Sequence, residues 1–459
     1  MFKDFRQSSR PSPPPAAVVS APARVRPVAA SAPAPDTAWH DLKQLLHEAI
    51  LSQMNLALIE QVDRADLRRE IGALISPLLQ DRGQSLGTER FRQLVAELLD
   101  EVLGLGPLEP LLADPSVSDI LVNGPDKIFV ERRGLLERSP LRFRDEAHLL
   151  RIIDKIVSRV GRRIDESQPY VDARLPDGSR VNAIVKPCAI DGASLSIRKF
   201  SADRLTLDRL VGFGALSETA AQFLSACVQA RMNALISGGT GSGKTTMLNA
   251  MSAFIDHRQR IVTIEDAAEL QLQQDHVVRL ETRPANAEGT GLISQRDLVK
   301  NALRMRPDRI VIGEVRGSEA FDMLQAMNTG HDGSMTTIHA NTARDAIARL
   351  EQMVVMIGAD FPMSAVRAQI GAGIQIVVQL NRLADGSRRV MSIGEVTGLE
   401  NGVVLMQDLF RFTKTGLDAD GRVTGHFGPT GIRPRCMDQL RAAGFDLPPG
   451  TFTAAQVAS

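Results

Sequence analysis

The sequence predicts an α/β protein built from more than one domain. A glycine-rich phosphate-binding motif stands between a short apolar strand and a helical stretch, and strands alternate with helices after it. Before it, short strands alternate with turn residues. Because 459 residues exceed the size at which one core keeps growing, we expect two or three domains. The alternation of strands and helices predicts a parallel sheet wound with helices on both sides, preceded by a separate α+β sheet domain and a small helical module.

The charge and cysteine content narrow the function classes. The 54 Lys and Arg balance the 54 Asp and Glu, and aromatic residues make up 4% of the chain. Nucleic-acid motors instead stack bases on aromatic side chains along basic grooves, so no nucleic-acid partner is expected. The three cysteines lie too far apart in the sequence to form a CxxC pair, and no apolar stretch reaches the length of a membrane span. We expect a cytoplasmic protein that reaches a membrane only by docking onto other proteins.

The first part of the chain divides into a tail and a helical module. Residues 1–38 are rich in proline, alanine and serine, a composition that predicts disorder because it buries too little apolar surface to offset the entropy of ordering. Residues 39–103 place apolar residues at helical spacing, which we interpret as the module's own core rather than a partner-binding face. These residues are Leu42, Leu45, Leu46, Ile50 and Leu51; Leu56, Leu58 and Ile59; Leu67, Ile71, Leu74 and Ile75; and Phe91, Leu94, Val95, Leu98 and Leu99.

Residues 104–200 are predicted to form the α+β sheet domain. The segment begins at a glycine- and proline-containing break, and residues 146–160 predict its helix. Short runs of β-forming residues separated by turn residues predict its strands. The predicted strands are 120–123, 128–131, 135–137, 172–175, 180–185 and 194–198.

Three arginines lie on or beside the predicted strands of this domain: Arg174, Arg180 and Arg198. Arginine suits bidentate contact with phosphate and can stabilise the charge on a transferring γ-phosphoryl group. Ordinary charges on a solvent-facing strand explain the same pattern equally well. From the residues alone, both interpretations stay open.

A linker at 201–210 is expected to lead into the nucleotide domain, residues 211–459. Its phosphate-binding motif is GGTGSGKT, which fits the P-loop pattern. The glycines allow backbone N–H groups to face phosphates at close range, and the following helix points its N-terminus at the same anions. Lys244 is expected to reach the β- and γ-phosphates, and Thr245 to offer a hydroxyl to Mg²⁺. The expected nucleotide-binding residues are Gly238, Gly239, Thr240, Gly241, Ser242, Gly243, Lys244, Thr245 and Thr246.

Acidic residues follow two of the later predicted strands. The strand at 260–264 ends in Glu265 and Asp266, and the strand at 309–313 ends at Glu314. These are carboxyl ends of strands, where α/β folds bind their ligands. Glu265 is the candidate to position an attacking water, and Glu314 is the candidate to hold Mg²⁺ through water together with Thr245. Which of the two glutamates is the base stays open.

A hydroxyl-rich run near residue 335 contains His331 and His339. His339 is a candidate to sense the γ-phosphate by hydrogen bonding, and a structural histidine is the alternative. Metal binding is disfavoured because no carboxylate or cysteine cluster accompanies the two histidines at ligand spacing.

Four segments together resemble the secretion-and-pilus traffic ATPase superfamily. They are the P-loop, VTIEDAAEL from Val262, QRDLVKNALRMRPDRIVIGEVRG from Gln295, and TGHDGSMTTIHAN from Thr329. The nearest match is the CpaF branch, the motor of Tad (tight adherence) pili, and the resemblance covers the chain from about Trp39 onward. It implies a RecA-like P-loop ATPase domain, a PAS-like N-terminal sheet domain and ring-shaped homo-hexamers.

The resemblance also implies roles and partners. The cofactors would be ATP and Mg²⁺, and the protein would act at the cytoplasmic face of the inner membrane on pilus platform proteins, and through them on pilin. The residues it implicates are Glu265 and Asp266 of the Asp box, Glu314 of Walker B, His339 of the His box, and Arg174, Arg180 and Arg198, which reach a nucleotide from the N-terminal domain.

The cysteines depart from part of that superfamily. Assembly motors of type II secretion and type IVa pili usually carry a four-cysteine zinc module after the His box, and the three cysteines of this chain cannot form one. Two alternatives to the Tad motor remain. One is a type IV secretion motor that moves protein or DNA, and the other is a RecA-like nucleic-acid motor.

Overall fold

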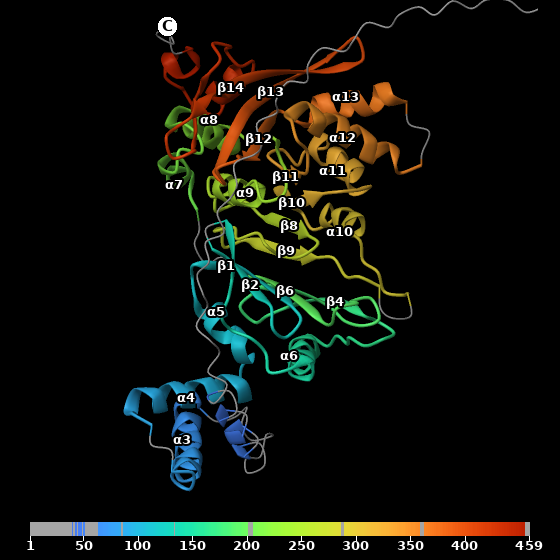
Figure 1. Ribbon diagram of the computed structural model, residues 1–459. Helices are drawn as coiled ribbons and strands as arrows, with labels where there is room; N and C mark the ends of the chain where they lie inside the picture. The colour runs from blue at the N-terminus through green and yellow to red at the C-terminus, as the bar shows by residue number, and fades with distance from the viewer. Residues whose placement is uncertain are drawn as a thin grey trace, which may run out of the picture.

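The computed structural model describes residues 63–454 except 84–85, 133, 201–204, 286–288 and 359–361, together with some positions between 39 and 50. The predicted tail at 1–38 and the predicted helix around Leu56 and Ile59 lie outside the described residues. Figure 1 shows three regions stacked along the length of the molecule: a helical module, a smaller sheet domain and a larger sheet domain. Among the described residues, no helix combines the length and apolar character needed to cross a membrane.

The helical module contains α3 (Arg64–Gln80) and α4 (Thr88–Val102). The predicted apolar stripes form its core, since Leu67, Ile71, Leu94 and Leu98 are fully buried in one cluster. The module connects through a 3-10 turn, η1 (Gly106–Leu108), and α5 (Glu109–Ala113) to the sheet domain. At this junction Lys155 donates hydrogen bonds to three carbonyls at the end of α4, those of Val102, Leu103 and Gly104, at 3.2, 3.0 and 2.8 Å.

The described residues of the N-terminal domain form a six-stranded antiparallel sheet in the order β3-β2-β1-β6-β5-β4. One face packs on α6, with residues such as Ile120, Ile153 and Leu195 in a common core. The opposite face turns toward the larger domain (Figure 1). The elements are β1 (Val117–Asn123), β2 (Ile128–Arg132), β3 (Leu135–Arg138), α6 (Glu146–Arg159), β4 (Tyr170–Arg174), β5 (Arg180–Ile184) and β6 (Ser194–Arg198).

The described residues of the larger domain form a nine-stranded sheet in the order β15-β14-β13-β12-β7-β11-β10-β8-β9. The strands from β12 to β9 in this order are parallel, and β13 to β15 extend the sheet as antiparallel hairpins. The strands are β7 (Ala234–Gly238), β8 (Ile261–Glu265), β9 (Val277–Glu281), β10 (Arg309–Val315), β11 (Met335–Ile338), β12 (Ile376–Arg382), β13 (Arg388–Glu400), β14 (Val403–Leu417) and β15 (Val423–Pro429).

Helices cover both faces of this sheet, as the parallel strands require. Alternate residues of β7 show the two layers, because Ala234 and Ile236 pack with one group of helices whereas Leu235 packs with the other. The first group is α7 (Leu207–Gly212), α8 (Glu218–Gln229), α9 (Lys244–Ser252), α14 (Met437–Ala442) and the 3-10 turn η2 (Pro449–Phe452); the second is α10 (Gln295–Ala302), α11 (Glu319–Asn328), α12 (Ala343–Val355) and α13 (Met363–Gly373).

The predicted linker at 201–210 extends too far. Residues from Leu207 onward belong to α7, whose first turn is capped by the Thr206 side chain accepting the N–H of Arg209. Leu207 and Leu210 are buried in the core of the larger domain. A threonine cap and two buried leucines therefore fix residues 206–210 on that domain.

Candidate functional site

The four predicted motifs meet at one edge of the nine-stranded sheet. Strands β7, β11, β10 and β8 are adjacent and parallel. Their carboxyl ends therefore share an edge, which is where open α/β sheets bind ligands. The P-loop follows β7, His339 follows β11, Glu314 lies near the end of β10, and Glu265 ends β8.

The P-loop is shaped for close approach of an anion. Gly241 and Gly243 have positive φ angles of 68° and 96°, a conformation that side chains other than glycine rarely adopt. A Cβ on Gly238 would lie 2.4 Å from Ser242 Oγ and 2.6 Å from the carbonyl oxygen of Leu380. Helix α9 begins directly after Gly243 with no side-chain cap. Its first N–H groups are therefore free to bind phosphate, and the loop fits the phosphates of a nucleoside triphosphate.

Lys244 lies within this loop. Its Nζ donates to the carbonyl oxygen of Gly239 at 3.1 Å. Burial lowers the pKa of Lys244, and the nearby carboxylate of Glu314 acts in the opposite direction. The ammonium group is thus close to the loop backbone and to the acidic strand end, as expected for a group that binds β- and γ-phosphates.

Glu265 is almost fully buried, with 3% of its surface exposed. Its Oε2 accepts the backbone N–H groups of Glu269 and Leu270 at 2.7 and 2.9 Å. Its Oε1 is buried with no hydrogen-bond partner among the described residues. Burial raises the pKa of Glu265 to about 7, against these two hydrogen bonds. A carboxyl group with a pKa near neutrality is suited to general-base chemistry.

Glycine at position 313 makes room for Glu265. Gly313 lies in the neighbouring strand β10, and a Cβ there would be 2.9 Å from Glu265 Cγ. The carboxylate therefore fits against a strand that lacks a side chain at this point.

Glu314 lies within β10, whereas the sequence predicted that the strand stops before it. It forms an ion pair with Arg316, with Oε2 and Nη2 at 2.7 Å, and the same guanidinium lies 3.6 Å from Asp266. Arg316 was not predicted from the sequence, although it is the second residue after Glu314. The guanidinium links Asp266, which directly follows β8, to Glu314 of β10.

Thr245 and Glu314 are the residues that would hold Mg²⁺. The described part of the chain contains no group of three or more His, Cys, Asp or Glu side chains arranged as a metal site. This donor set suits Mg²⁺, because that ion keeps several waters and binds through one or two carboxylates together with substrate phosphates. The residues fit an ion that arrives with the nucleotide.

His339 directly follows β11 and is partly exposed at the ligand edge. Its carbonyl oxygen accepts a hydrogen bond from Arg349 Nη1 at 2.8 Å. The backbone at this position is thus held by α12, and a sensing role for the imidazole stays a prediction.

The three arginines of the N-terminal domain form one row across its sheet. Arg174 pairs with Arg180 across β4 and β5, Arg180 pairs with Arg198 across β5 and β6, and Arg198 pairs with Asp119 across β6 and β1. Directly opposed residues share a face of an antiparallel sheet. We define these four residues as the arginine row.

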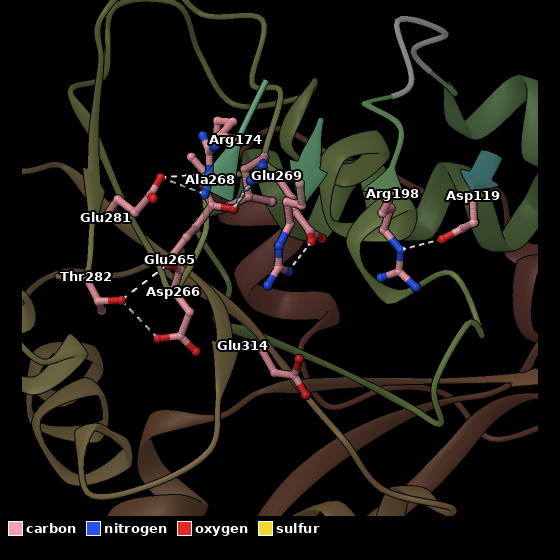
Figure 2. Close-up of polar contacts among 12 residues, drawn as sticks. Asp119, Arg174, Arg198, Glu265, Asp266, Ala268, Glu269, Glu281, Thr282 and Glu314 are labelled. Atoms are coloured by element: carbon pink, nitrogen blue, oxygen red, sulfur yellow. Dashed lines mark hydrogen bonds and ion pairs between the residues drawn. The ribbon is translucent and has the colours of Figure 1, made fainter. Parts of the chain in front are cut away.

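Two members of the arginine row reach the larger domain. Arg174 forms an ion pair with Glu281 at 2.8 Å, and Arg180 with Glu269 at 2.6 Å. Arg198 instead contacts Asp119 at 3.2 Å within its own sheet. Figure 2 shows Arg174 near Glu281 and Ala268, with Arg198 turned toward Asp119 on the other side of the view.

The arginine row and the P-loop helix share a cavity. The cavity has a volume of about 260 Å³ and lies between the two sheet domains. It is lined by Arg180, Arg198, Lys199 and Phe200 on one side, and by Thr245, Thr246, Asn249, Glu269 and Gln271 on the other. The structure thus brings Arg180 and Arg198 to the start of α9. All four members of the arginine row also line a neighbouring cavity of about 1050 Å³, together with Asp266 and Arg316.

Two further arginines near the P-loop escaped the sequence analysis. Arg388 Nε donates to the carbonyl oxygen of Gly241 at 2.9 Å, and Arg382 Nη2 donates to that of Gly134 in the N-terminal domain at 2.8 Å. Both come from the β12–β13 hairpin, far from every motif in the sequence. No local pattern distinguishes them from ordinary surface arginines.

A family model described as type II/IV secretion system protein matches residues 101–416. The chain belongs to this family. The match covers the smaller sheet domain and the larger one as far as β14, including the arginine row, the P-loop and the acidic strand ends.

Two relatives illustrate the range of the type II/IV secretion system family. A Mycobacterium tuberculosis (strain H37Rv) protein, provisionally named as a conjugal transfer protein, is 40% identical over 312 residues, which cover 67% of this chain and 88% of the relative. The type IV secretion system protein PtlH of Bordetella pertussis (strain Tohama I) is 36% identical over 324 residues, covering 64% and 95%.

A solved structure is also similar. The VirB11 ATPase from the Brucella suis type IV secretion system is 30% identical, with 62% of this chain and 94% of that chain covered. The TM-score is 0.35, so the two whole chains do not superpose closely.

Proposed function

We propose that this family member is a hexameric, Mg²⁺-dependent ATPase. The observation that carries the proposal is the meeting of the P-loop, Glu314 and Glu265 at one sheet edge, with Arg180 and Arg198 across a cavity from the start of α9. The cavity joins a phosphate-binding helix N-terminus to guanidinium groups from a second domain. This combination of groups stabilises charge on a transferring phosphoryl group.

Each residue has a role in this chemistry. The P-loop amides and Lys244 bind the β- and γ-phosphates, and Glu265 accepts a proton from the attacking water. Arg180 and Arg198 neutralise charge on the γ-phosphoryl group, and His339 senses its presence by hydrogen bonding. Bound Mg²⁺, held by Thr245 and Glu314, supplies further positive charge at the phosphate oxygens.

Hydrolysis is proposed to move the N-terminal domain. The arginine row contacts the larger domain through charged groups, and loss of the γ-phosphate removes negative charge that its guanidinium groups bind. A closed ATP state and a looser ADP state follow. In a homo-hexamer this motion applies force to a partner.

We propose the assembly of Tad pili as the process powered, at the cytoplasmic face of the inner membrane. The support is the resemblance of the four motif segments to the CpaF branch. The force would act on platform proteins and through them on pilin.

A type IV secretion motor is the second candidate. The names of the relatives favour it, since they include a type IV secretion system protein and a conjugal transfer protein. Its cargo would be protein or DNA rather than pilin.

Two experiments test these proposals. The purified protein is expected to hydrolyse ATP, and Lys244→Ala is expected to abolish hydrolysis because it removes the ammonium group at the phosphates. Hydrolysis that persists in Lys244→Ala would contradict the site. In cells, deletion of the gene is expected to remove surface pili and leave conjugation and protein secretion intact. Loss of secretion or conjugation with normal pili would favour the second candidate.

A further inference from the structure

The three arginines of the arginine row lie side by side, and carboxylates, two of them from the larger domain, offset their positive charge. Arg174, Arg180 and Arg198 lie directly opposite one another on neighbouring strands, and like charges in such positions repel. Each has a carboxylate partner. Asp119 serves Arg198 from the same sheet, whereas Glu269 and Glu281 come from the larger domain.

Glu269 lies in the cavity that the proposed function gives to the phosphates. It lines this cavity with Thr245 and Thr246, and its Oε1 is 2.6 Å from Arg180 Nη1. The carboxylate of Glu269 therefore faces the phosphate-binding groups as well as Arg180.

The backbone of Glu269 contacts the candidate base. Its N–H donates to Glu265 Oε2 at 2.7 Å. The N–H of Ala268 donates to Glu281 Oε2 at 3.1 Å, and that same oxygen pairs with Arg174 at 2.8 Å. The Arg180–Glu269 ion pair thus ends on the short turn that holds Glu265. The Arg174–Glu281 ion pair is linked to the same turn through the N–H of Ala268 (Figure 2).

We propose that Glu269 is a positioning residue that holds Arg180 until ATP binds, and that the γ-phosphate then takes Arg180 from it. This inference rests on the ATP site proposed above. Glu269 thus occupies the place beside Arg180 that the γ-phosphate would take. Transfer of Arg180 to the phosphate breaks the ion pair with Glu269, on the turn whose N–H groups bind Glu265. Binding of ATP therefore changes the contacts of the turn that holds the candidate base.

The test is the affinity for a fluorescent, non-hydrolysable ATP analogue with Mg²⁺. Glu269→Gln keeps the backbone N–H and nearly the same shape but removes the charge that competes for Arg180. We expect it to bind the analogue about two- to fivefold more tightly, a change typical of a partly exposed ion pair. Glu269→Asp keeps the charge and is expected to bind with an affinity close to that of the wild type.

A double-mutant cycle separates this role from a structural one. Arg180→Ala is expected to weaken binding, and Glu269→Gln in that background is expected to bring no gain, because its effect acts through Arg180. The matched control is Glu137→Gln. Glu137 lies on the edge strand β3 of the same sheet, and its exposed carboxylate pairs with Arg132 of β2. This variant is expected to leave the affinity unchanged.

The outcomes distinguish this inference from the proposed function. A wild-type protein that fails to bind the analogue would overturn both. Normal wild-type binding, with no gain in Glu269→Gln or an equal gain in the Arg180→Ala background, would overturn the role of Glu269 alone. Near-wild-type circular dichroism and melting temperature identify variants that are folded and fit for the comparison.

Discussion

At the scale of single residues, Glu265 determines how the site responds to pH. Its side chain is buried, one oxygen accepts two backbone N–H groups, and the other has no partner among the described residues. Burial raises its pKa from 4.5 to about 7. The folded protein therefore binds a proton at this site more tightly than the unfolded chain does.

This difference predicts a pH dependence of stability. Between pH 4.5 and 7 the folded state holds more protons at Glu265 than the unfolded state, so this residue's contribution to stability falls as pH rises. The loss is about 3 kcal/mol at most. Chemical denaturation of the nucleotide-free protein at pH 5 and pH 8 is expected to show a smaller loss in Glu265→Gln. An equal loss in the variant and the wild type would show that Glu265 does not titrate in this range.

The two glutamates can be separated by their dependence on Mg²⁺. Glu265→Gln and Glu314→Gln are both expected to lose turnover, because one removes the base and the other a metal-binding carboxylate. Only Glu314→Gln is expected to raise the Mg²⁺ concentration for half-maximal turnover, by about tenfold. Titration of residual activity with Mg²⁺ measures this difference. The reverse pattern would exchange the two roles.

At the scale of secondary-structure elements, the motifs were predictable and the cross-strand relations were not. Glycine spacing and a carboxylate after an apolar strand are local signals, so the P-loop, Glu265 and Glu314 could be assigned to the carboxyl ends of strands. The pairing of Arg174 with Arg180, and of Arg180 with Arg198, depends on strand register. Register is set by turns and by the buried face. The sequence alone therefore could not tell phosphate-binding arginines from ordinary charges on a strand face.

The partners in the ion pairs and the outer strands of the larger sheet could not be predicted from the sequence either. Glu269 meets Arg180 across 89 positions of sequence, and no local pattern marks such a pair. At the turn from β12 to β13, where the antiparallel part of the sheet begins, Arg388 contacts Gly241 of the P-loop and Arg382 contacts Gly134 of the N-terminal domain. Tertiary packing decides both arrangements.

The contact between β10 and Glu265 gives a prediction at this scale. Gly313→Ala would place a methyl group 2.9 Å from Glu265 Cγ, which forces the carboxylate to move. We expect turnover to fall about tenfold or more, with a loss of about 1–3 kcal/mol of stability from overpacking. Steady-state kinetics and denaturant unfolding measure the two effects. Gly212→Ala, in α7 with no neighbouring atom within 4 Å of the new Cβ, is the control and is expected to retain full activity. Full activity in Gly313→Ala would contradict the role of Glu265.

At the scale of the whole molecule, the proposed hexamer predicts that activity depends on assembly. If ring formation is needed to hold the arginine row closed over the P-loop domain, the monomer hydrolyses ATP slowly. Activity per chain is expected to rise with protein concentration as rings form, since association follows mass action. Hydrolysis measured beside light scattering checks this. A flat activity profile in a sample shown to be monomeric would contradict the dependence of the site on assembly.

The central claim is that nucleotide state sets the angle between the two sheet domains, and the most direct test is a distance between them. Cys188 is exposed on the N-terminal domain, whereas Cys227 and Cys436 are buried, and Gln222→Cys adds a second exposed label site on α8. We expect spin labels at the two sites to give distinct distance distributions with a non-hydrolysable ATP analogue and with ADP. Lys244→Ala is expected to abolish the difference. Distributions that overlap fully while the labelled protein still hydrolyses ATP would contradict the account.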